Sequence, residues 1–366
     1  MINTKKFFVE LKKNKIDFFS GVPDSILKNF SNYLDKFKKK NIIAVNEGNA
    51  VGIGIGYFLS TKKIPCIYFQ NSGLGNSINP LISIAHRKVY SIPMLLIIGW
   101  RGSPKVNNDE PQHNLKGKIT ESILKLLNIK TIIIRKNKDL SKIKKLIQFS
   151  KKTNQPVACL VEKNTFSKIN FKRIFKNKSQ IQRSDFIELL LNLINYKSKI
   201  ISTTGYTSRE LYQIRKIKKY KKGKDFYMVG GMGHTAIVSS SFSKFSNYNS
   251  ICLDGDGSFL MHLGSIFTSS HIASKKFKYI LLNNGSHESV GGQKTFSENL
   301  NIKQISKAFK FKNYFIIKSK KDMNRKLKLF LKSHGPSFLE VIIKNQSLKN
   351  LTRPKNLIDI KKEFIK

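Results

Sequence analysis

Residues 251–288 read ICLDGDGSFLMHLGSIFTSSHIASKKFKYILLNNGSHE, and this stretch decides the fold. An apolar strand is predicted at residues 251–253, and the tight turn of residues 255–258 follows it. After a helical segment, a second apolar strand at residues 279–282 leads into two asparagines. This order predicts a βαβ unit with parallel strands, whose carboxyl ends lie on the same edge of a sheet.

The two strand ends carry residues that suit a metal ion and a diphosphate. Asp256 and Asn284 are expected to converge, and a carboxylate, an amide oxygen and a nearby backbone carbonyl are hard ligands for Mg²⁺. Gly255 and Gly257 let a ligand approach the backbone, and Ser258 opens the next helix, whose free N–H groups favour an anion. A GDG turn alone is also a common connection between a strand and a helix.

The GDGS turn with NN after the second strand resembles the diphosphate motif of thiamine diphosphate (ThDP) enzymes. The resemblance implies that Asp256, Asn284 and the backbone carbonyl of Ser286 bind Mg²⁺. It also implies that these residues and the turn of residues 255–258 bind the cofactor, thiamine diphosphate.

Glu47 follows a predicted strand at residues 42–45 and precedes a helix with glycines at positions 52, 54 and 56. Glycine weakens a helix, so these glycines indicate close packing against another helix or subunit. A desolvated glutamate at such a junction would have a raised pKa, whereas an exposed one would only be favoured by the helix dipole. NEGNAVGIGIGY resembles the glutamate-helix segment of ThDP enzymes, which implies that Glu47 protonates the aminopyrimidine ring of the cofactor.

A second ligand-contacting junction is predicted in residues 226–242, FYMVGGMGHTAIVSSSF, where a strand, a glycine-rich turn and an apolar helix follow one another. Met232 could also be an ordinary core residue. GGMGH is similar to the segment that holds the aminopyrimidine in ThDP enzymes. This implies that Gly230 and Gly233 contact the cofactor and that Met232 keeps it bent, while His234 faces the substrate or starts the helix.

Residues 100–117, WRGSPKVNNDEPQHNLKG, are expected to form an irregular loop, and long loops in compact domains often act as lids. DEPQH after GWRG, and SHESVGGQ at residues 286–293, resemble loops of phosphonopyruvate decarboxylases. This implies a substrate or proton-transfer role for His113, although a lone loop histidine is usually a surface residue. The candidate substrate residues are Ser25, Asn71, Ser72, Arg101, His234, His287, Gln293 and Lys294.

The resemblance covers nearly the whole chain and is strongest to the phosphonopyruvate decarboxylases, a two-domain form of the ThDP decarboxylases without a middle domain. It implies two doubly wound α/β domains with parallel sheets. The expected parts are a pyrimidine-binding domain over residues 1–166, a charged linker over 167–183 and a diphosphate-binding domain over 184–366. Residues 106–108 depart from the family's pattern.

The activity that this resemblance implies is non-oxidative decarboxylation of 3-phosphonopyruvate to phosphonoacetaldehyde and CO₂, in phosphonate biosynthesis. Decarboxylation of sulfopyruvate or of another 2-oxo acid is the alternative of the same class. A non-catalytic protein that binds nucleic acid or another polyanion is the alternative of a different class. The family also implies a homodimer or higher homo-oligomer with its active site at a subunit interface.

The net charge is +46, from 68 Lys and Arg against 22 Asp and Glu. Such a charge attracts nucleic acids, yet the basic residues are spread along the chain without a nucleic-acid motif, so no specific nucleic-acid partner is expected. A solvated basic surface that attracts a small anionic 2-oxo acid is the preferred interpretation. We expect no membrane span, no signal peptide and a cytoplasmic protein, since long apolar runs are absent and the three cysteines form no CxxC pair.

Overall fold

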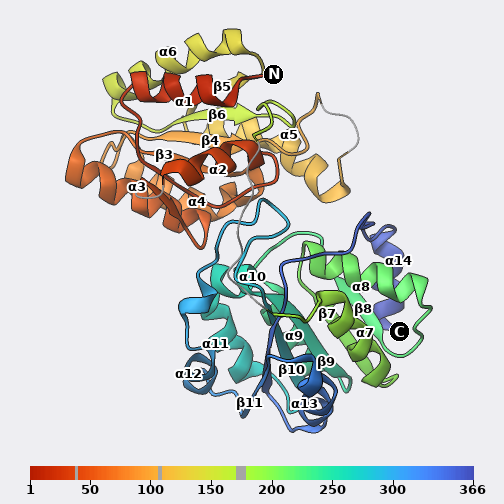
Figure 1. Cartoon of the computed structure of the whole chain (residues 1–366). Coiled ribbons are helices and arrows are strands. Elements are labelled where there is room, and N and C mark those ends of the chain that lie inside the picture. Colours follow the sequence, from red (N-terminus) through yellow and green to blue (C-terminus); the bar gives the residue numbers. More distant parts are fainter. Residues whose placement is uncertain (38–39, 106–108, 170–178) are drawn as a thin grey trace. The chain divides into compact units, whose positions relative to one another are not determined.

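The structure is a computed structural model that describes residues 1–37, 40–105, 109–169 and 179–366. The chain divides into two compact units, Met1–Arg173 and Ile174–Lys366 (Figure 1). The segment expected to depart from the family's pattern, 106–108, lies outside the described residues. So does the middle of the expected linker, residues 170–178, and its exact bounds therefore stay a prediction.

Unit 1 contains, within its described residues, a six-stranded parallel sheet in the order β2-β1-β3-β4-β6-β5. The strands are β1 (Phe19–Gly21), β2 (Asn41–Ile43), β3 (Cys66–Gln70), β4 (Leu95–Gly99), β5 (Lys130–Ile134) and β6 (Val157–Val161). The helices are α1 (Thr4–Lys13), α2 (Lys28–Leu34), α3 (Glu47–Thr61), α4 (Leu74–Pro80), α5 (Pro111–Leu126) and α6 (Leu140–Thr153), with short turns η1 (Asp35–Phe37), η2 (Asn71–Gly73), η3 (Leu81–Ala85) and η4 (Asn137–Asp139).

Unit 2 contains a second parallel sheet, whose described strands follow the order β11-β12-β10-β9-β7-β8. The strands are β7 (Ser198–Ser202), β8 (Lys224–Tyr227), β9 (Asn249–Gly255), β10 (Phe277–Asn283), β11 (Asn313–Ile317) and β12 (Ser337–Ile342). The helices are α7 (Arg183–Leu193), α8 (Tyr206–Ile217), α9 (Thr235–Phe245), α10 (Asp256–Met261), α11 (Leu263–Ile272), α12 (Ile302–Ala308), α13 (Lys320–Lys332) and α14 (Leu357–Ile365), with the short turn η5 (Ser297–Asn299).

The two sheets have the same topology. When the strands of each unit are numbered from its own first strand, both sheets read 2-1-3-4-6-5. In each unit the chain first moves to one edge and then returns to the other side of its first strand. These reversals lie between β1 and β3 and between β7 and β9, where open α/β sheets bind ligands at the carboxyl ends of the strands. The expected fold class is confirmed.

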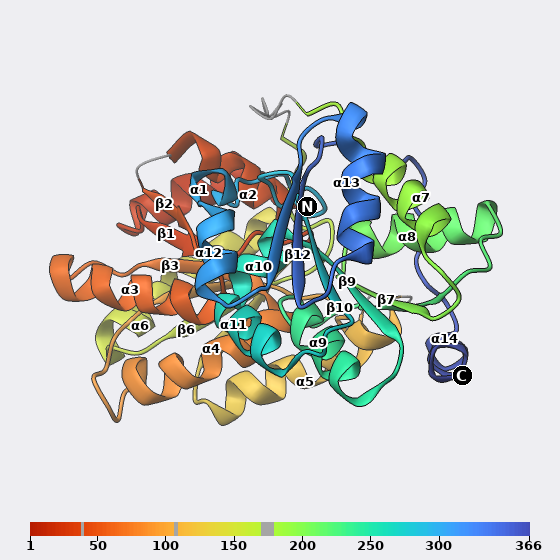
Figure 2. The same ribbon diagram turned by 90° about the horizontal axis from the view of Figure 1, so that it is seen from below.

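Successive side chains of the central strands of unit 2 point to opposite faces of the sheet, and an apolar layer forms on each face. Ile251, Leu253 and Ile280 pack with residues of α7, α8 and α13, whereas Cys252 and Tyr279 pack with residues of α9, α11 and α12. Figure 2 shows these two groups of helices on opposite sides of β9 and β10. The predicted βαβ unit of residues 251–288 is thus the centre of a sheet covered on both faces.

The expected irregular loop of residues 100–117 is wrong in its second half, because α5 begins at Pro111. Proline suits the first position of a helix, where its missing N–H would have had no intrahelical partner. The loop lies tightly on this helix: the Trp100 indole N–H donates to the Gly117 carbonyl over 2.9 Å, and an added Cβ at Gly117 would lie 1.6 Å from the Gly102 carbonyl oxygen. His113 is therefore a helix residue.

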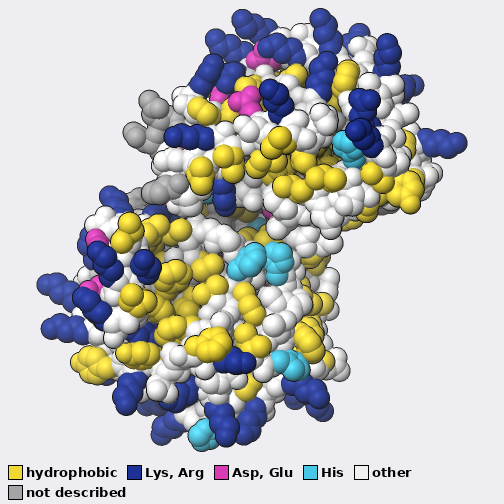
Figure 3. All heavy atoms as spheres, turned by 180° about the vertical axis from the view of Figure 1, so that it is seen from behind, with side chains coloured by type: hydrophobic (Ala, Val, Ile, Leu, Met, Phe, Trp, Pro, Cys, Tyr) yellow, Lys and Arg dark blue, Asp and Glu magenta, His cyan; other side chains and the backbone are white. Residues whose placement is uncertain are grey.

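The surface and the cysteines agree with the composition. Lys and Arg side chains are scattered over the visible face of each unit and do not gather in one patch (Figure 3). Cys66, Cys159 and Cys252 are buried free thiols. Among the described helices, none combines the length and the apolar character that a membrane crossing needs.

We predict that Gly21→Ala destabilises unit 1, because an added Cβ would lie 2.0 Å from the backbone oxygen of Tyr68 on the neighbouring strand. Overpacking of this kind typically costs roughly 1–3 kcal/mol. Gly264→Ala is the control, since a Cβ there meets nothing within 4 Å in α11 and alanine favours a helix. Urea unfolding followed by circular dichroism compares the two, and equal stabilities would contradict the proposed crowding at Gly21.

Candidate active-site residues

The GDG turn places Asp256 at the carboxyl edge of the unit 2 sheet. Leu282 pairs with Gly255 in the parallel register, so the residues after both strands emerge side by side. The backbone N–H of Asn284 donates to the Asp256 carboxylate, and so do the hydroxyls of Thr295 and, over 3.1 Å, Ser297. Asp256 and Asn284 thus meet as expected, and their role as metal ligands stays a prediction.

Burial dominates the electrostatics of this carboxylate. Asp256 is 3% exposed, and burial raises its pKa to about 6, although the hydroxyls of Thr295 and Ser297 oppose the rise. A cation beside the carboxylate would lower that pKa again, because an opposite charge favours the ionised form. The site therefore holds a carboxylate whose charge is incompletely compensated.

A short hairpin joins Asn284 to the groups that hold Asp256. Ser286 bridges antiparallel to Lys294, and the backbone N–H of His287 donates to the Gln293 carbonyl over 2.7 Å. The hairpin then delivers Thr295, whose hydroxyl bonds Asp256. The third predicted metal ligand, Ser286, is therefore carried on a loop tied back to the first.

The GGMGH turn packs directly against the GDG turn. The Gly233 N–H donates to Ser258 Oγ over 3.0 Å, and an added Cβ at Gly257 would lie 2.9 Å from the His287 ring and 3.1 Å from Met232 Cε. Gly233 has φ of +87°, which side chains rarely adopt. Three segments predicted to contact the cofactor, around Gly230, Asp256 and Ser286, thus meet within unit 2.

Sequence reasoning missed His262, which lies at the break between α10 and α11. Its ring centre is 4.8 Å from that of the exposed His234, whose Nδ1 lies 3.2 Å from the Gly231 carbonyl oxygen. His262 Nε2 is buried and has no hydrogen-bond partner among the described residues, and burial lowers the pKa of this imidazole. The signal was a histidine inside the largely apolar run FLMHLGSIF.

Glu47 is the first residue of α3 and is only 6% exposed, so the alternative of an exposed first-turn glutamate is wrong. The side-chain amide of Asn76 donates to Glu47 Oε2 over 2.8 Å. An added Cβ at Gly73 would lie 2.1 Å from Oε1, so the carboxyl occupies space that only glycine leaves open. Burial raises the pKa of Glu47, while the Asn76 bond opposes that rise.

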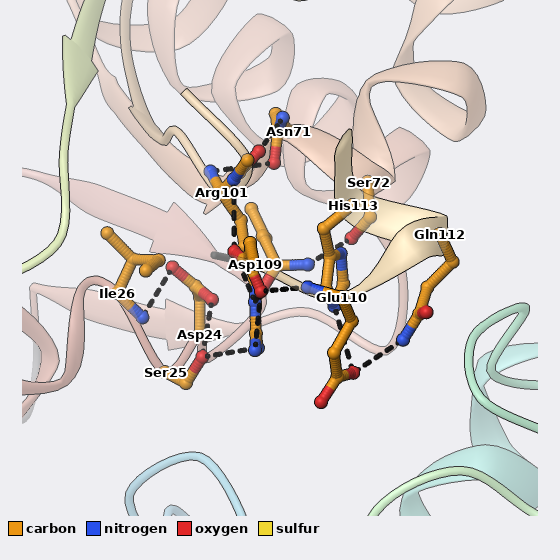
Figure 4. A network of polar contacts seen from close by, with 12 residues as sticks. Asp24, Ser25, Ile26, Asn71, Ser72, Arg101, Asp109, Glu110, Gln112 and His113 are labelled. Carbon is orange, nitrogen blue, oxygen red and sulfur yellow. Dashed lines mark hydrogen bonds and ion pairs between the residues drawn. The ribbon is translucent and has the colours of Figure 1, made fainter. Parts of the chain in front are cut away.

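Asn71 and Arg101 join the loops that follow β3 and β4 (Figure 4). The Asn71 side chain donates to the Arg101 carbonyl over 2.9 Å and accepts from its N–H over 3.1 Å. The Arg101 guanidinium bonds the Asp109 carboxylate at 3.2–3.3 Å and lies 3.4 Å from Ser25 Oγ. Three of the candidate substrate residues are therefore in one network, while Ser72 is exposed and accepts from the Gln70 amide.

Asp24 lies beside this network and is 2% exposed. Asp24 does not cap a helix, since α2 begins only at Lys28; its Oδ2 accepts the backbone N–H groups of Ile26 and Leu27, each over 3.1 Å. Burial raises the pKa of Asp24 to about 6, although these bonds and the Arg101 charge favour the ionised form. A carboxyl with this pKa can exchange a proton near neutral pH.

His113 sits in the first turn of α5 and is 7% exposed, so it is not a surface residue. Its Nε2 lies 3.9 Å from Glu110 Oε2, and its Nδ1 is buried without a hydrogen-bond partner in the described chain. Burial, with the Arg101 charge adding to it, lowers the pKa of His113 to about 4. The imidazole is therefore neutral at pH 7.

The remaining candidate substrate residues lie in the unit 2 hairpin. Gln293 is 1% exposed, and neither end of its amide has a hydrogen-bond partner among the residues described. Lys294 is exposed and lies 3.9 Å from Glu298. His287 is half-buried, and burial lowers its pKa to about 4. The eight candidates are divided equally between the two units.

Two family models match the chain, one in each unit. The model described as thiamine pyrophosphate enzyme, N-terminal TPP binding domain, matches residues 4–122. The model described as thiamine pyrophosphate enzyme, C-terminal TPP binding domain, matches residues 203–341. Two parallel-sheet units, each matched by such a domain, define a thiamine diphosphate enzyme.

Curated relatives of this chain are decarboxylases by name, which narrows the class of thiamine diphosphate enzyme. A phosphonopyruvate decarboxylase of Streptomyces viridochromogenes is 31% identical over 354 residues, covering 92% of this chain and 87% of that protein. The enzyme of that name from Streptomyces hygroscopicus is 29% identical over 373 residues, covering 97% and 91%. The sulfopyruvate decarboxylase subunit alpha of Methanocaldococcus jannaschii is 38% identical over 157 residues, covering 42% and 88%. The chain belongs to the phosphonopyruvate decarboxylase family and is a ThDP-dependent carboxy-lyase, as the sequence motifs indicated.

We predict that Asp24→Asn stabilises the protein at pH 8 and has little effect at pH 4. The folded state keeps a proton on Asp24 up to about pH 6, whereas the ordinary value is 3.8, so the wild type loses stability as the pH rises between these values. The difference at pH 8 is at most about 3 kcal/mol. Urea unfolding at the two pH values measures it, and an effect independent of pH would show that the Asp24 proton is not responsible.

Proposed function

We propose that this chain catalyses the ThDP- and Mg²⁺-dependent decarboxylation of 3-phosphonopyruvate to phosphonoacetaldehyde and CO₂, as a step of phosphonate biosynthesis. The observation that carries the proposal is the buried meeting of Asp256 and Asn284 beside the GGMGH turn. The near full-length similarity to two phosphonopyruvate decarboxylases supports the substrate.

The residues at the edge of unit 2 fit the cofactor and the metal ion. Asp256, Asn284 and the carbonyl of Ser286 are oxygen donors of the kind that Mg²⁺ prefers. Gly257, where a Cβ would be crowded, adds no side chain to the turn of residues 255–258. Bound ThDP supplies an electron sink for the electron pair that departing CO₂ leaves behind. The protein contributes binding, orientation and proton transfer.

Glu47 and the Arg101 network supply the groups for proton transfer and substrate binding. Its raised pKa suits the Glu47 carboxyl to sharing a proton with a ring nitrogen of the cofactor. Asp24, with a pKa of about 6, and the neutral imidazole of His113 are the candidates for exchanging a proton with the substrate. Arg101 and Ser25 offer donors to a phosphonate.

Decarboxylation of sulfopyruvate is the second candidate, because a relative is a subunit of an enzyme with that name. A sulfonate carries acceptor oxygens that the same Arg101 and Ser25 donors can bind, so this network by itself does not separate the two anions. Direct competition between the substrates separates them.

A homodimer or higher homo-oligomer completes the proposal, with unit 1 of one subunit and unit 2 of another forming each active site. The support comes from α3, where Gly52 and Gly56 lie one turn apart and a Cβ at either would meet nothing within 4 Å. Gly75 of α4 is equally open, and Leu59 is 66% exposed. Glycine costs about 0.5–1 kcal/mol in a helix relative to alanine, and an open glycine face suits close approach of a second copy.

The first experiment measures CO₂ release from phosphonopyruvate, sulfopyruvate and pyruvate by protein supplied with ThDP and Mg²⁺. We expect phosphonopyruvate to be preferred. Glu47→Gln should lower turnover roughly 10²–10⁴-fold with an unchanged circular dichroism spectrum, since it removes a proton-transfer group. Asp256→Ala should abolish turnover through loss of a metal ligand.

Glu121→Gln, at an exposed position of α5, is the control for these variants and should leave turnover unchanged. A preference for sulfopyruvate or pyruvate would refute the substrate while leaving the cofactor assignment intact. Full activity of Glu47→Gln would refute the role of that glutamate, and strong, salt-dependent DNA binding without any turnover would favour a polyanion-binding protein.

We predict that Gly56→Leu dissociates the oligomer and abolishes CO₂ release together, because a bulky side chain on the open face of α3 blocks the approach of a second copy. Analytical ultracentrifugation measures the assembly. Lys145→Leu, on an exposed position of α6, is the control and should keep both the assembly and the activity. A fully active monomer would refute the shared site.

A further inference from the structure

The side-chain amide of Asn284 is held from both ends. Its Nδ2 donates to Glu288 Oε2 over 3.1 Å, and its Oδ1 accepts the backbone N–H of Ser286 over 3.1 Å. A carboxylate can only accept and an N–H can only donate, so these two partners decide which end of the amide is oxygen. If the amide turned over, an NH₂ group, which cannot bind a cation, would replace Oδ1.

Glu288 is itself held by a buried arginine. Arg183 Nη2 lies 2.5 Å from Glu288 Oε2, and Nη1 donates to Glu210 Oε1 over 3.1 Å. All three side chains are largely buried: Arg183 is 5% exposed, Glu288 15% and Glu210 0%. Arg183 begins α7 and Glu210 lies in α8, so two helices of the scaffold fix the carboxylate that orients Asn284.

Asn345, which follows β12, holds the backbone of the same segment. Its Nδ2 donates to the Asn284 carbonyl over 2.8 Å, and its Oδ1 accepts from Ser286 Oγ at 2.5 Å. One amide therefore spans both predicted ligands of the metal ion. Glu288 and Asn345 act on different groups and come from different parts of unit 2.

We propose that Glu288, held by Arg183, and Asn345 are positioning residues that keep Asn284 and Ser286 arranged to bind Mg²⁺. This inference rests on the proposed function, which makes Asn284 and Ser286 metal ligands. Groups that orient ligands in this way typically change metal affinity 10–100-fold when they are removed. Each residue bonds a predicted metal ligand, so both act through the ligands.

Unit 2 offers a matched control in a second buried ion pair. Arg215 and Asp225 bond through Nη2–Oδ1 at 2.5 Å and Nε–Oδ2 at 2.7 Å, with side chains 14% and 3% exposed. This pair joins α8 to β8 and shares no hydrogen bond with Asn284 or Ser286. Asp225→Ala therefore removes a carboxylate partner of a buried arginine, as Glu288→Ala does, without removing a partner of a predicted metal ligand.

The experiment titrates the full-length chain with Mg²⁺ at saturating ThDP in a calorimeter. We expect about 10–100-fold weaker Mg²⁺ binding for Glu288→Ala and for Asn345→Ala, and a change below about twofold for Asp225→Ala. Glu288→Gln keeps an oxygen acceptor for the Asn284 amide and should recover most of the affinity. Circular dichroism verifies that each variant is folded.

Equal affinities of wild type and Glu288→Ala would overturn the inference, and so would an equal loss in Asp225→Ala. If Glu288→Ala does not fold, Asn345→Ala and Glu288→Gln decide: wild-type affinity in Asn345→Ala overturns the positioning role. If the wild type binds no Mg²⁺ in the presence of ThDP, the cofactor assignment itself is overturned. If the wild type binds Mg²⁺ tightly and the variants bind it equally well, only the positioning role is overturned.

Discussion

The buried carboxylate of Asp256 at the edge of a parallel sheet is the constraint on which the rest of unit 2 depends. It is taken out of water by the packing of β9 and β10, and it is tolerable there only because the Asn284 N–H and two hydroxyls bond it. Those partners require the hairpin after β10 to fold back on the GDG turn. One desolvated charge thus sets the course of the chain from Asn284 to Ser297.

Burial also shifts the pKa values of three site residues in unit 1. It raises the pKa of Glu47 and Asp24 and lowers that of His113, so burial favours the neutral form of all three groups. The same desolvation therefore acts on two carboxyls and an imidazole within one unit. Glycines make the space for this, since Gly73 borders Glu47 and Gly99 borders Asp24 at distances that exclude a Cβ.

Family membership was readable from local patterns because short motifs carry their own chemistry. GDGS and GGMGH each combine glycine, which allows a ligand close to the backbone, with oxygen or sulfur groups near a strand end, and NN adds amide oxygens at the end of the next strand. The structure brings these segments together in unit 2 as expected. Their ligand roles stay predictions.

The sequence by itself determined that there are two α/β units, that their strands run parallel and which residues lie at the strand ends. Periodicity and turn residues indicate these features because they are local properties of the chain. Only the tertiary structure decided that His113 is a buried helix residue, that Asp24 holds a turn, and that His262 lies against His234. It also decided that Glu288 and Asn345 hold Asn284. The reason is physical: burial, and hydrogen bonds between residues far apart in the chain, depend on how distant segments pack, and no local pattern encodes that packing.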